Sequence, residues 1–210
     1  MELVKVNNQG VEVYDAVRIV ESFPEEKITS DITFMNANTE AVSLSQLKSE
    51  CIIPVFAKDN ETTVSHQEFI ETVMYVADRI FSGEAILKPA IRVSHPIKGR
   101  IPEAMGKPAK DLLDHEKTLY YERMAFAIEI PTLQGEIGGN ALNLTLGGVR
   151  AYNLENLYAR KVEERFKIFI GFQNRVCTNL CVSTDGLKGE VRVKSIGELA
   201  KQAFDLFGNF

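Results

Sequence analysis

The sequence predicts an α+β protein with a mainly antiparallel sheet and helices packed on one face of that sheet. Residues 120–194 contain several segments in which apolar and polar side chains alternate, as in half-buried strands. Residues 65–82 and 195–207 instead carry apolar side chains at helical spacing, and each segment opens with a capping signal. The chain has 210 residues, 45% hydrophobic and 25% charged, which is typical of a globular protein with a real core.

The two predicted helices begin with the same pair of residue types. Ser65 is followed three residues later by Glu68, so that each side chain can satisfy a backbone amide left open at the start of a helix. Ser195 and Glu198 repeat this spacing. We therefore expect the apolar stripes of both helices to pack against the sheet.

The strands are predicted from strict alternation. Met124, Phe126, Ile128 and Ile130 point one way in the segment 120–131, and the segments 140–148 and 166–172 repeat the pattern. We also expect short strands at 51–57 and 90–94, and a helix over 153–166 that is capped by Asn153. The glycines of 135–148 do not have the spacing or context of a dinucleotide-binding loop, so a glycine-rich hairpin is expected there.

A long, stiff loop is expected between these elements. The stretch "HPIKGRIPEAMGKPAKD" contains Pro96, Pro102 and Pro108, each of which removes a backbone donor and favours extended geometry before it. A short helix is expected to follow over 109–117.

The first third of the chain differs in charge from the rest. Residues 1–65 hold eleven acidic and five basic side chains, a net charge of −6, whereas residues 66–210 have a net charge of +1. We divide the chain into a loosely organised acidic segment, 1–50, with a short helix near 41–49, and a single α+β domain, 51–210. No apolar run approaches the ~20 residues of a membrane span and no secretory signal is seen, so a cytoplasmic protein without a membrane partner is expected.

The stretch "RVCTNLCVSTDG" raises the question of a metal or redox site. Asp185-Gly186 is a strong hairpin signal, which predicts a strand before it with Cys177 and Cys181 on one face. Along one strand their sulfurs would lie roughly 13 Å apart, too far for a disulfide or a shared metal ion. We therefore expect two small apolar side chains and no metal or cofactor, although Cys51 or His95 remains open as a partner for one of them.

One region interleaves basic and aromatic side chains, as single-stranded nucleic acid requires for its phosphates and bases. Residues 138–175 hold six basic and three acidic residues, a net charge of +3. The alternative is an ordinary exposed helix face. The candidate nucleic-acid-binding residues are Arg150, Tyr152, Tyr158, Arg160, Lys161, Arg165, Lys167 and Arg175.

A second candidate site lies in the loop "VSHPIKGR", where His95, Lys98 and Arg100 offer cations and a titratable ring to an anion such as phosphate. Its spacing matches no phosphate-binding loop, and the alternative is a solvated loop. No catalytic pattern surrounds the three histidines, so no reaction is indicated.

Four blocks of the sequence resemble a known family. "FAKDNETTVSHQEFIETV", "IRVSHPIKGRIPEA", "EKTLYYERMAFAIEIP" and "GGVRAYNLENLY" resemble, in this order, an uncharacterised family from conjugative elements and phages of anaerobic gut bacteria, a domain of unknown function. The resemblance covers about residues 50–190. The stretch "FQNRVCTNLCVSTDG" is similar to a C-x-N element of phage/plasmid-like proteins. The resemblance implies a cytoplasmic accessory of mobile DNA and, because relatives run further, a truncated chain is one interpretation of its apolar end.

Together these observations predict a non-enzymatic accessory of a mobile element or phage that contacts nucleic acid, single-stranded DNA or RNA. Two alternatives stay open. One is a protein-binding module that blocks a host defence or replication factor, with the acidic N-terminal third as a decoy for a basic partner. The other is a small enzyme with a phosphate-binding loop at 94–100. The oligomeric state is open in all three.

Overall fold

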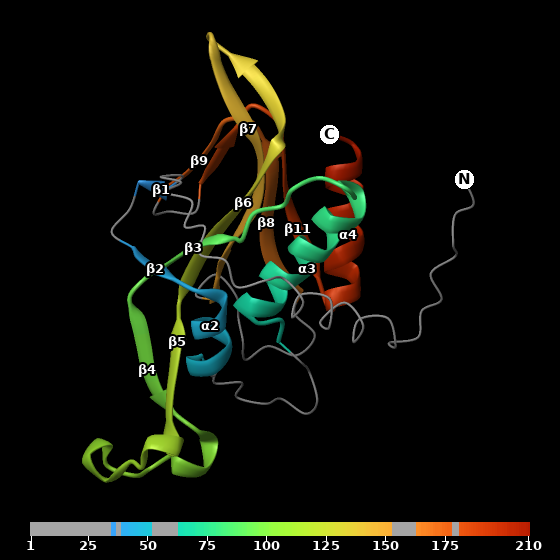
Figure 1. The fold of residues 1–210 in the computed structure, drawn as a ribbon. Helices are drawn as coiled ribbons and strands as arrows, with labels where there is room; N and C mark the ends of the chain where they lie inside the picture. The colour runs from blue at the N-terminus through green and yellow to red at the C-terminus, as the bar shows by residue number, and fades with distance from the viewer. Residues whose placement is uncertain (1–34, 37–38, 52–62, 153–162, 178–180) are drawn as a thin grey trace.

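A six-stranded antiparallel sheet forms the centre of the protein (Figure 1). The computed structural model describes residues 35–36, 39–51, 63–152, 163–177 and 181–210. Across the sheet the strands lie in the order β11 (Leu187–Val193), β8 (Glu164–Gly171), β7 (Asn140–Ala151), β6 (Arg123–Ile137), β3 (Ala90–Val93) and β2 (Glu40–Val42).

Two long helices, α3 (His66–Ile80) and α4 (Ile196–Gly208), cover one face of this sheet (Figure 1). Phe69 of α3 is fully buried and meets the rings of Phe126 at 5.2 Å and Phe166 at 4.7 Å, both edge-on. Burying such rings contributes about 1.5–3 kcal/mol each, so this layer dominates the core. The α+β prediction, with helices on one face of an antiparallel sheet, is confirmed.

The predicted caps are present. Ser65 Oγ accepts the Glu68 amide at 3.1 Å, and the Glu68 carboxylate accepts the Ser65 amide at 2.6 Å. At α4, Ser195 Oγ accepts the Glu198 amide at 3.2 Å, whereas the Glu198 carboxylate accepts the amide of Lys194. Both helices therefore begin where the sequence predicts.

The opposite face of the sheet carries small side chains and a second, smaller sheet. Its strands are β1 (Met35–Asn36), β9 (Asn174–Cys177) and β10 (Val182–Thr184), in the order β1-β9-β10. The buried residues of this second core are Ala125, Ala127, Val149, Ala151, Phe169 and Val176. Apart from Phe169 these side chains are small, which lets the second sheet approach closely.

The turn at Asp185-Gly186 differs from the predicted hairpin. Strand β10 pairs with β9, whereas β11 leaves it and pairs with β8, so the strands before and after the turn lie in different sheets. The Asp185 carboxylate instead accepts the amides of Phe172 at 2.9 Å and Gln173 at 2.8 Å, which fixes the turn between β8 and β9. Asp185-Gly186 does form a turn, as predicted, but the two strands that it joins do not pair with each other.

Part of the predicted loop is an arm that projects from one end of the sheet (Figure 1). It consists of β4 (Pro96–Arg100) paired with β5 (Lys117–Tyr121). The predicted helix over 109–117 is wrong, because the tip holds three short 3-10 turns, Pro102–Ala104, Ala109–Asp111 and Asp114–Glu116. A hairpin of β6 and β7 projects from the other end, and Gly138 and Gly139 make its turn with φ of 60° and 81°.

The structure also describes part of the acidic segment. Residues 39–50 contribute β2 to the main sheet and α2 (Leu44–Glu50), whose Lys48 forms a 2.6 Å ion pair with Glu71 of α3. Residues 52–57 of the strand expected at 51–57, most of the helix expected over 153–166 and residues 1–34 lie outside the described residues. Residues 164–166 belong to β8. No described helix is long and apolar enough to cross a membrane.

Candidate functional site

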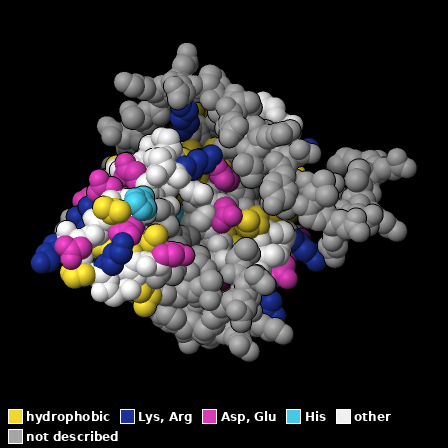
Figure 2. Space-filling model, turned by 90° about the horizontal axis from the view of Figure 1, so that it is seen from below, with side chains coloured by type: hydrophobic (Ala, Val, Ile, Leu, Met, Phe, Trp, Pro, Cys, Tyr) yellow, Lys and Arg dark blue, Asp and Glu magenta, His cyan; other side chains and the backbone are white. Residues whose placement is uncertain are grey.

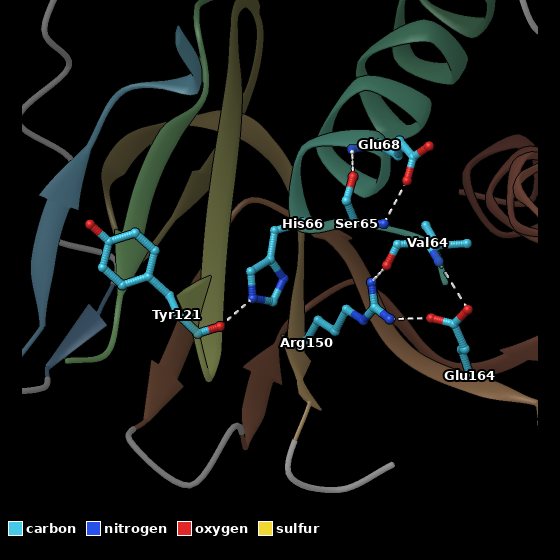
Figure 3. A network of polar contacts seen from close by, with 7 residues as sticks. All are labelled: Val64, Ser65, His66, Glu68, Tyr121, Arg150 and Glu164. Carbon is cyan, nitrogen blue, oxygen red and sulfur yellow. Dashed lines mark hydrogen bonds and ion pairs between the residues drawn. The ribbon is translucent and has the colours of Figure 1, made fainter. Parts of the chain in front are cut away.

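A buried polar network lies where helix α3 begins, beside the ends of β5 and β7 (Figure 3). Its centre is Arg150, which is 1% exposed although it carries a full charge. The guanidinium donates to the Val64 carbonyl and to the Glu164 carboxylate, and the other Glu164 oxygen accepts the Val64 amide at 3.0 Å. Such a buried charge is tolerated because its donors are paired.

Aromatic rings complete the environment of Arg150. Its guanidinium carbon lies 4.5 Å from the ring centres of both Tyr152 and Phe166. A guanidinium between aromatic faces is stabilised by the ring quadrupoles, more strongly when water is excluded. Arg150 therefore joins the start of α3 to β7 and β8, which is a structural role.

His66 lies next to this arginine and is uncharged. Its Nε2 lies 2.8 Å from the Tyr121 carbonyl oxygen, which can only accept, so the ring proton is on Nε2. Burial, with the charge of Arg150 as a second cause, lowers the pKa of His66 to about 3. Its Nδ1 is then a buried acceptor, and it has no hydrogen-bond partner among the described residues.

A pocket of about 290 Å³ opens beside His66. The apolar and aromatic part of its lining is Leu47, Cys51, Tyr120, Tyr121 and Tyr152. The polar part is the first turn of α3 with its cap, Ser65, His66, Gln67 and Glu68. The Tyr152 ring lies against His66 with centres 4.3 Å apart and planes tilted by 34°, and Tyr120 meets Tyr152 edge-on at 6.0 Å.

Cys51, His66 and Tyr121, which line the pocket, are neutral at pH 7. Burial, and secondly the charge of Glu50, raises the pKa of the Cys51 thiol to about 11. Burial also raises the pKa of the Tyr121 hydroxyl above its usual range. A nucleophilic cysteine needs a lowered pKa, so the Cys51 thiol lacks the activation that covalent catalysis requires.

A basic surface lies on the face of the sheet turned away from α3 and α4. In the antiparallel register, Arg165 of β8 stands directly opposite Arg192 of β11, and Lys167 stands opposite Glu190. Lys188 shares this face, and its ammonium donates to the Val182 carbonyl of β10 at 2.9 Å. We call Arg165, Lys167, Lys188 and Arg192 the basic strand face; with Glu190 its net charge is +3.

The structure separates the predicted nucleic-acid-binding residues into three groups. Arg150 and Tyr152 lie in the interior, where their contacts are with the protein itself, and we withdraw them from the candidate surface. Arg165 and Arg175 are exposed, and Lys167 is half-buried. Tyr158, Arg160 and Lys161 lie outside the described residues. Sequence reasoning missed Lys188 and Arg192. Their alternation with Leu187, Gly189 and Val191 indicated a strand with its basic residues on one face.

The predicted anion-binding residues lie on the projecting arm. His95 and Lys98 are exposed, and Arg100 donates to the Lys107 carbonyl across the base of the tip. Among the residues that the structure describes, His95, Lys98 and Arg100 share no hydrogen bond or ion pair with one another. Figure 2 looks onto the arm from its free end and shows basic and acidic side chains interspersed over it, rather than a concentrated positive site.

The backbone changes the interpretation of Cys177 and Cys181. The chain does not run through them as one strand, because β9 and β10 fold back on each other with Val176 opposite Val182 and Arg175 opposite Ser183. Continued by one position, this register places residue 177 opposite residue 181, so the premise of one continuous strand, on which the estimate of roughly 13 Å depended, is wrong. Cys51 lies in the pocket, and no three described His, Cys, Asp or Glu residues are arranged to hold a metal ion.

The fold and site define a sheet protein with one helical layer, a buried arginine network and a pocket that no cationic side chain lines. The chain belongs to a family whose model matches residues 14–210 and is described as "Domain of unknown function, B. Theta Gene description (DUF3871)". No curated protein and no solved structure matched the chain. Membership of an uncharacterised family is thus confirmed, whereas the mobile-element context stays a prediction.

Proposed function

We propose that this protein binds the sugar-phosphate backbone of nucleic acid through its basic strand face, as a non-enzymatic accessory of mobile DNA. The observation that carries the proposal is the pairing of Arg165 directly opposite Arg192. Like charges at directly opposed positions of an antiparallel pair are unfavourable. The Glu190 carboxylate, 3.5 Å from the Arg192 guanidinium, offsets part of this repulsion, and a bound polyanion would offset more of it. The mobile-element context rests on the resemblance of the sequence blocks.

The surrounding charges support the same interpretation. Lys167 and Lys188 extend the arginine pair along two strands, and Glu190 is the single acidic residue among them. Arg175 is exposed on the small sheet that covers the same face of the main sheet. Cations spaced along strands suit a chain of phosphates, because each contact releases a condensed counterion.

Fluorescence anisotropy of labelled single- and double-stranded DNA and RNA oligomers tests the proposal at low and physiological salt. We expect micromolar binding that weakens steeply with salt. The double variant Arg165→Glu/Arg192→Glu should abolish binding at physiological salt and reduce the slope of log K against log salt by about 1.5. Arg79→Glu/Lys201→Glu is the matched control, because it makes the same change in net charge at exposed positions of α3 and α4, on the other side of the sheet, and should leave binding nearly unchanged.

Two results would contradict the proposal. One is the absence of binding at low salt, and the other is equal loss in the control and in the double variant, which would indicate a general effect of net charge. Stacking of bases on aromatic side chains would give a preference for single strands. The sequence analysis assigned stacking to Tyr158 among others, and Tyr158 lies outside the described residues. The comparison of single- and double-stranded oligomers therefore tests that part separately.

A further inference from the structure

We propose that residues 1–34, the leading segment, bind the basic strand face of their own chain and so compete with nucleic acid for that face. The competition rests on the proposed function, whereas the contact itself stands on charge and position. The occupant of this strongly charged surface is thus a stretch of the same chain that lies outside the described residues.

The leading segment and the basic strand face carry opposite charges of similar size. Residues 1–34 contain seven acidic and three basic side chains, a net charge of −4. The basic strand face has a net charge of +3, and Arg175, exposed on the small sheet over the same face of the main sheet, raises it to +4. Glu21, Glu25 and Glu26 fall within six residues of one another, so a short stretch can meet several of these cations.

The described chain starts close to the basic strand face. Met35 of β1 pairs with Val176, the residue after Arg175, so the leading segment joins the described chain beside an exposed cation (Figure 1). In the small sheet β1 and β10 flank β9 and lie about 10 Å apart. The Lys188 ammonium donates to the Val182 carbonyl of β10 at 2.9 Å, so the face begins where the small sheet ends.

Chain length allows the acidic cluster to reach this surface. Glu26 precedes Met35 by nine residues, which span at most about 30 Å when extended. From Lys188 to Arg192 the basic strand face extends over roughly 13 Å of β11. The acids nearest to Met35 can therefore meet the cations of the face while the described fold stays as it is.

Other described surfaces match the leading segment less well. The projecting arm carries basic and acidic side chains interspersed over its surface (Figure 2), so an acidic stretch meets repulsion there as well as attraction. On α4 the exposed Lys201 has Glu198 and Asp205 as neighbours one turn away on either side. The basic strand face holds one acid among four bases and is the better match.

Tethering makes weak contacts sufficient. A single exposed ion pair contributes little, because water and salt screen it. A segment joined to the surface by a short stretch of chain acts at an effective concentration on the order of 1 mM. A contact with a dissociation constant of about 0.1 mM then occupies the face roughly nine-tenths of the time and weakens a competitor about tenfold. Nucleic acid, whose charge is denser, can still displace the segment.

Carbodiimide cross-linking of the full chain tests the contact without nucleic acid, because the reagent joins carboxylates to lysine amines that touch them. Mass spectrometry of the digested monomer fraction should show residues 1–34 joined mainly to Lys167 and Lys188. Lys110 on the arm and Lys201 on α4 are exposed and serve as internal controls. Salt of about 0.5 M, where the screening length is roughly 4 Å, should remove the cross-links. Equal cross-linking to all four lysines, or cross-links only between two molecules, overturns the inference.

A charge variant of the full chain tests the competition, with the labelled oligomers of the anisotropy assay. Glu21→Gln/Glu25→Gln/Glu26→Gln takes three negative charges from the leading segment and keeps its length. It should weaken the contact about tenfold, which strengthens nucleic-acid binding about fivefold at low salt.

The matched control is Glu84→Gln/Glu103→Gln/Asp205→Asn, which makes the same change in net charge at exposed positions away from the basic strand face. It should change the affinity by less than about twofold, because distant exposed charges are screened. Equal strengthening in both variants overturns the competition. If no variant binds any oligomer while the cross-links to Lys167 and Lys188 persist, the proposed function fails and the contact stands.

Discussion

Arg150 and Glu164 form an ion pair inside the protein, with the arginine side chain fully buried and the carboxylate 12% exposed. Removing one partner of such a pair leaves the other charge uncompensated, which typically costs 3–5 kcal/mol. The pair also fixes the backbone of Val64 immediately before α3. The first prediction follows from this arrangement.

Arg150→Met should lower the free energy of unfolding by about 3 kcal/mol, because Glu164 and the Val64 carbonyl lose their donor. Urea denaturation followed by circular dichroism measures the effect. Arg165→Met, one residue beyond Glu164 on the exposed face, is the control and should change stability by less than about 0.5 kcal/mol. Similar losses in both variants would show that the buried pair has no special role.

The neutral His66 predicts a dependence of stability on pH. Its pKa is about 3 in the folded protein and about 6.5 when exposed, so between these values the unfolded chain binds more protons. Stability should therefore be retained above pH 6.5 and fall as pH decreases toward 3, by at most about 1.4 kcal/mol per pH unit. His66→Phe should reduce this slope between pH 4.5 and 7; an unchanged slope would assign it to carboxylates elsewhere.

Gly147 is expected to tolerate no side chain. A Cβ built there would lie 2.1 Å from the Phe126 carbonyl oxygen, and backbone cannot move aside cheaply. Gly147→Ala should therefore destabilise the protein by about 2–3 kcal/mol. At Gly189 the nearest atom, in Leu206, would be 3.7 Å away, so Gly189→Ala should be neutral or slightly stabilising in the same denaturation assay. Equal effects would contradict the close packing of β6 and β7.

Asp185→Ala should cost about 1–2 kcal/mol, because the carboxylate accepts two backbone amides of the turn between β8 and β9. Asp185→Asn keeps an acceptor oxygen and should recover part of the loss. Hydrogen exchange at Phe172 and Gln173 gives a local readout, and both amides should exchange faster in the alanine variant. Unchanged exchange would place the stabilising contact elsewhere.

The elements that sequence reasoning predicted correctly are those with local causes. The caps Ser65 and Ser195 and the alternation from Met124 to Ile130 act within a few residues, so they are visible in the chain itself. The β4–β5 arm depends on pairing Lys98 with Leu119, which are distant in sequence, and the prolines of its strand suggested a loop. Nonlocal pairing overrode the local signal.

The burial of Arg150 illustrates the same limit and one missed clue. Its basic charge and its aromatic neighbour Tyr152 fit a binding surface as well as a buried network. Position 150, however, has the same parity as Leu144 and Leu146, which face the helices. The alternation along β7 therefore places the Arg150 side chain in the core. The charge can be buried there because it is paired with Glu164, which comes from another strand.

Strand β11 ends the main sheet, and this position has a consequence for self-association. An outermost strand offers backbone groups to which another copy of the chain can add, and charged side chains discourage such pairing. Lys188, Glu190 and Arg192 alternate along this strand and are exposed. The charges proposed to attract a polyanion would thus also keep neighbouring molecules apart, so neutralising them for a binding experiment should lower the affinity and also promote self-association.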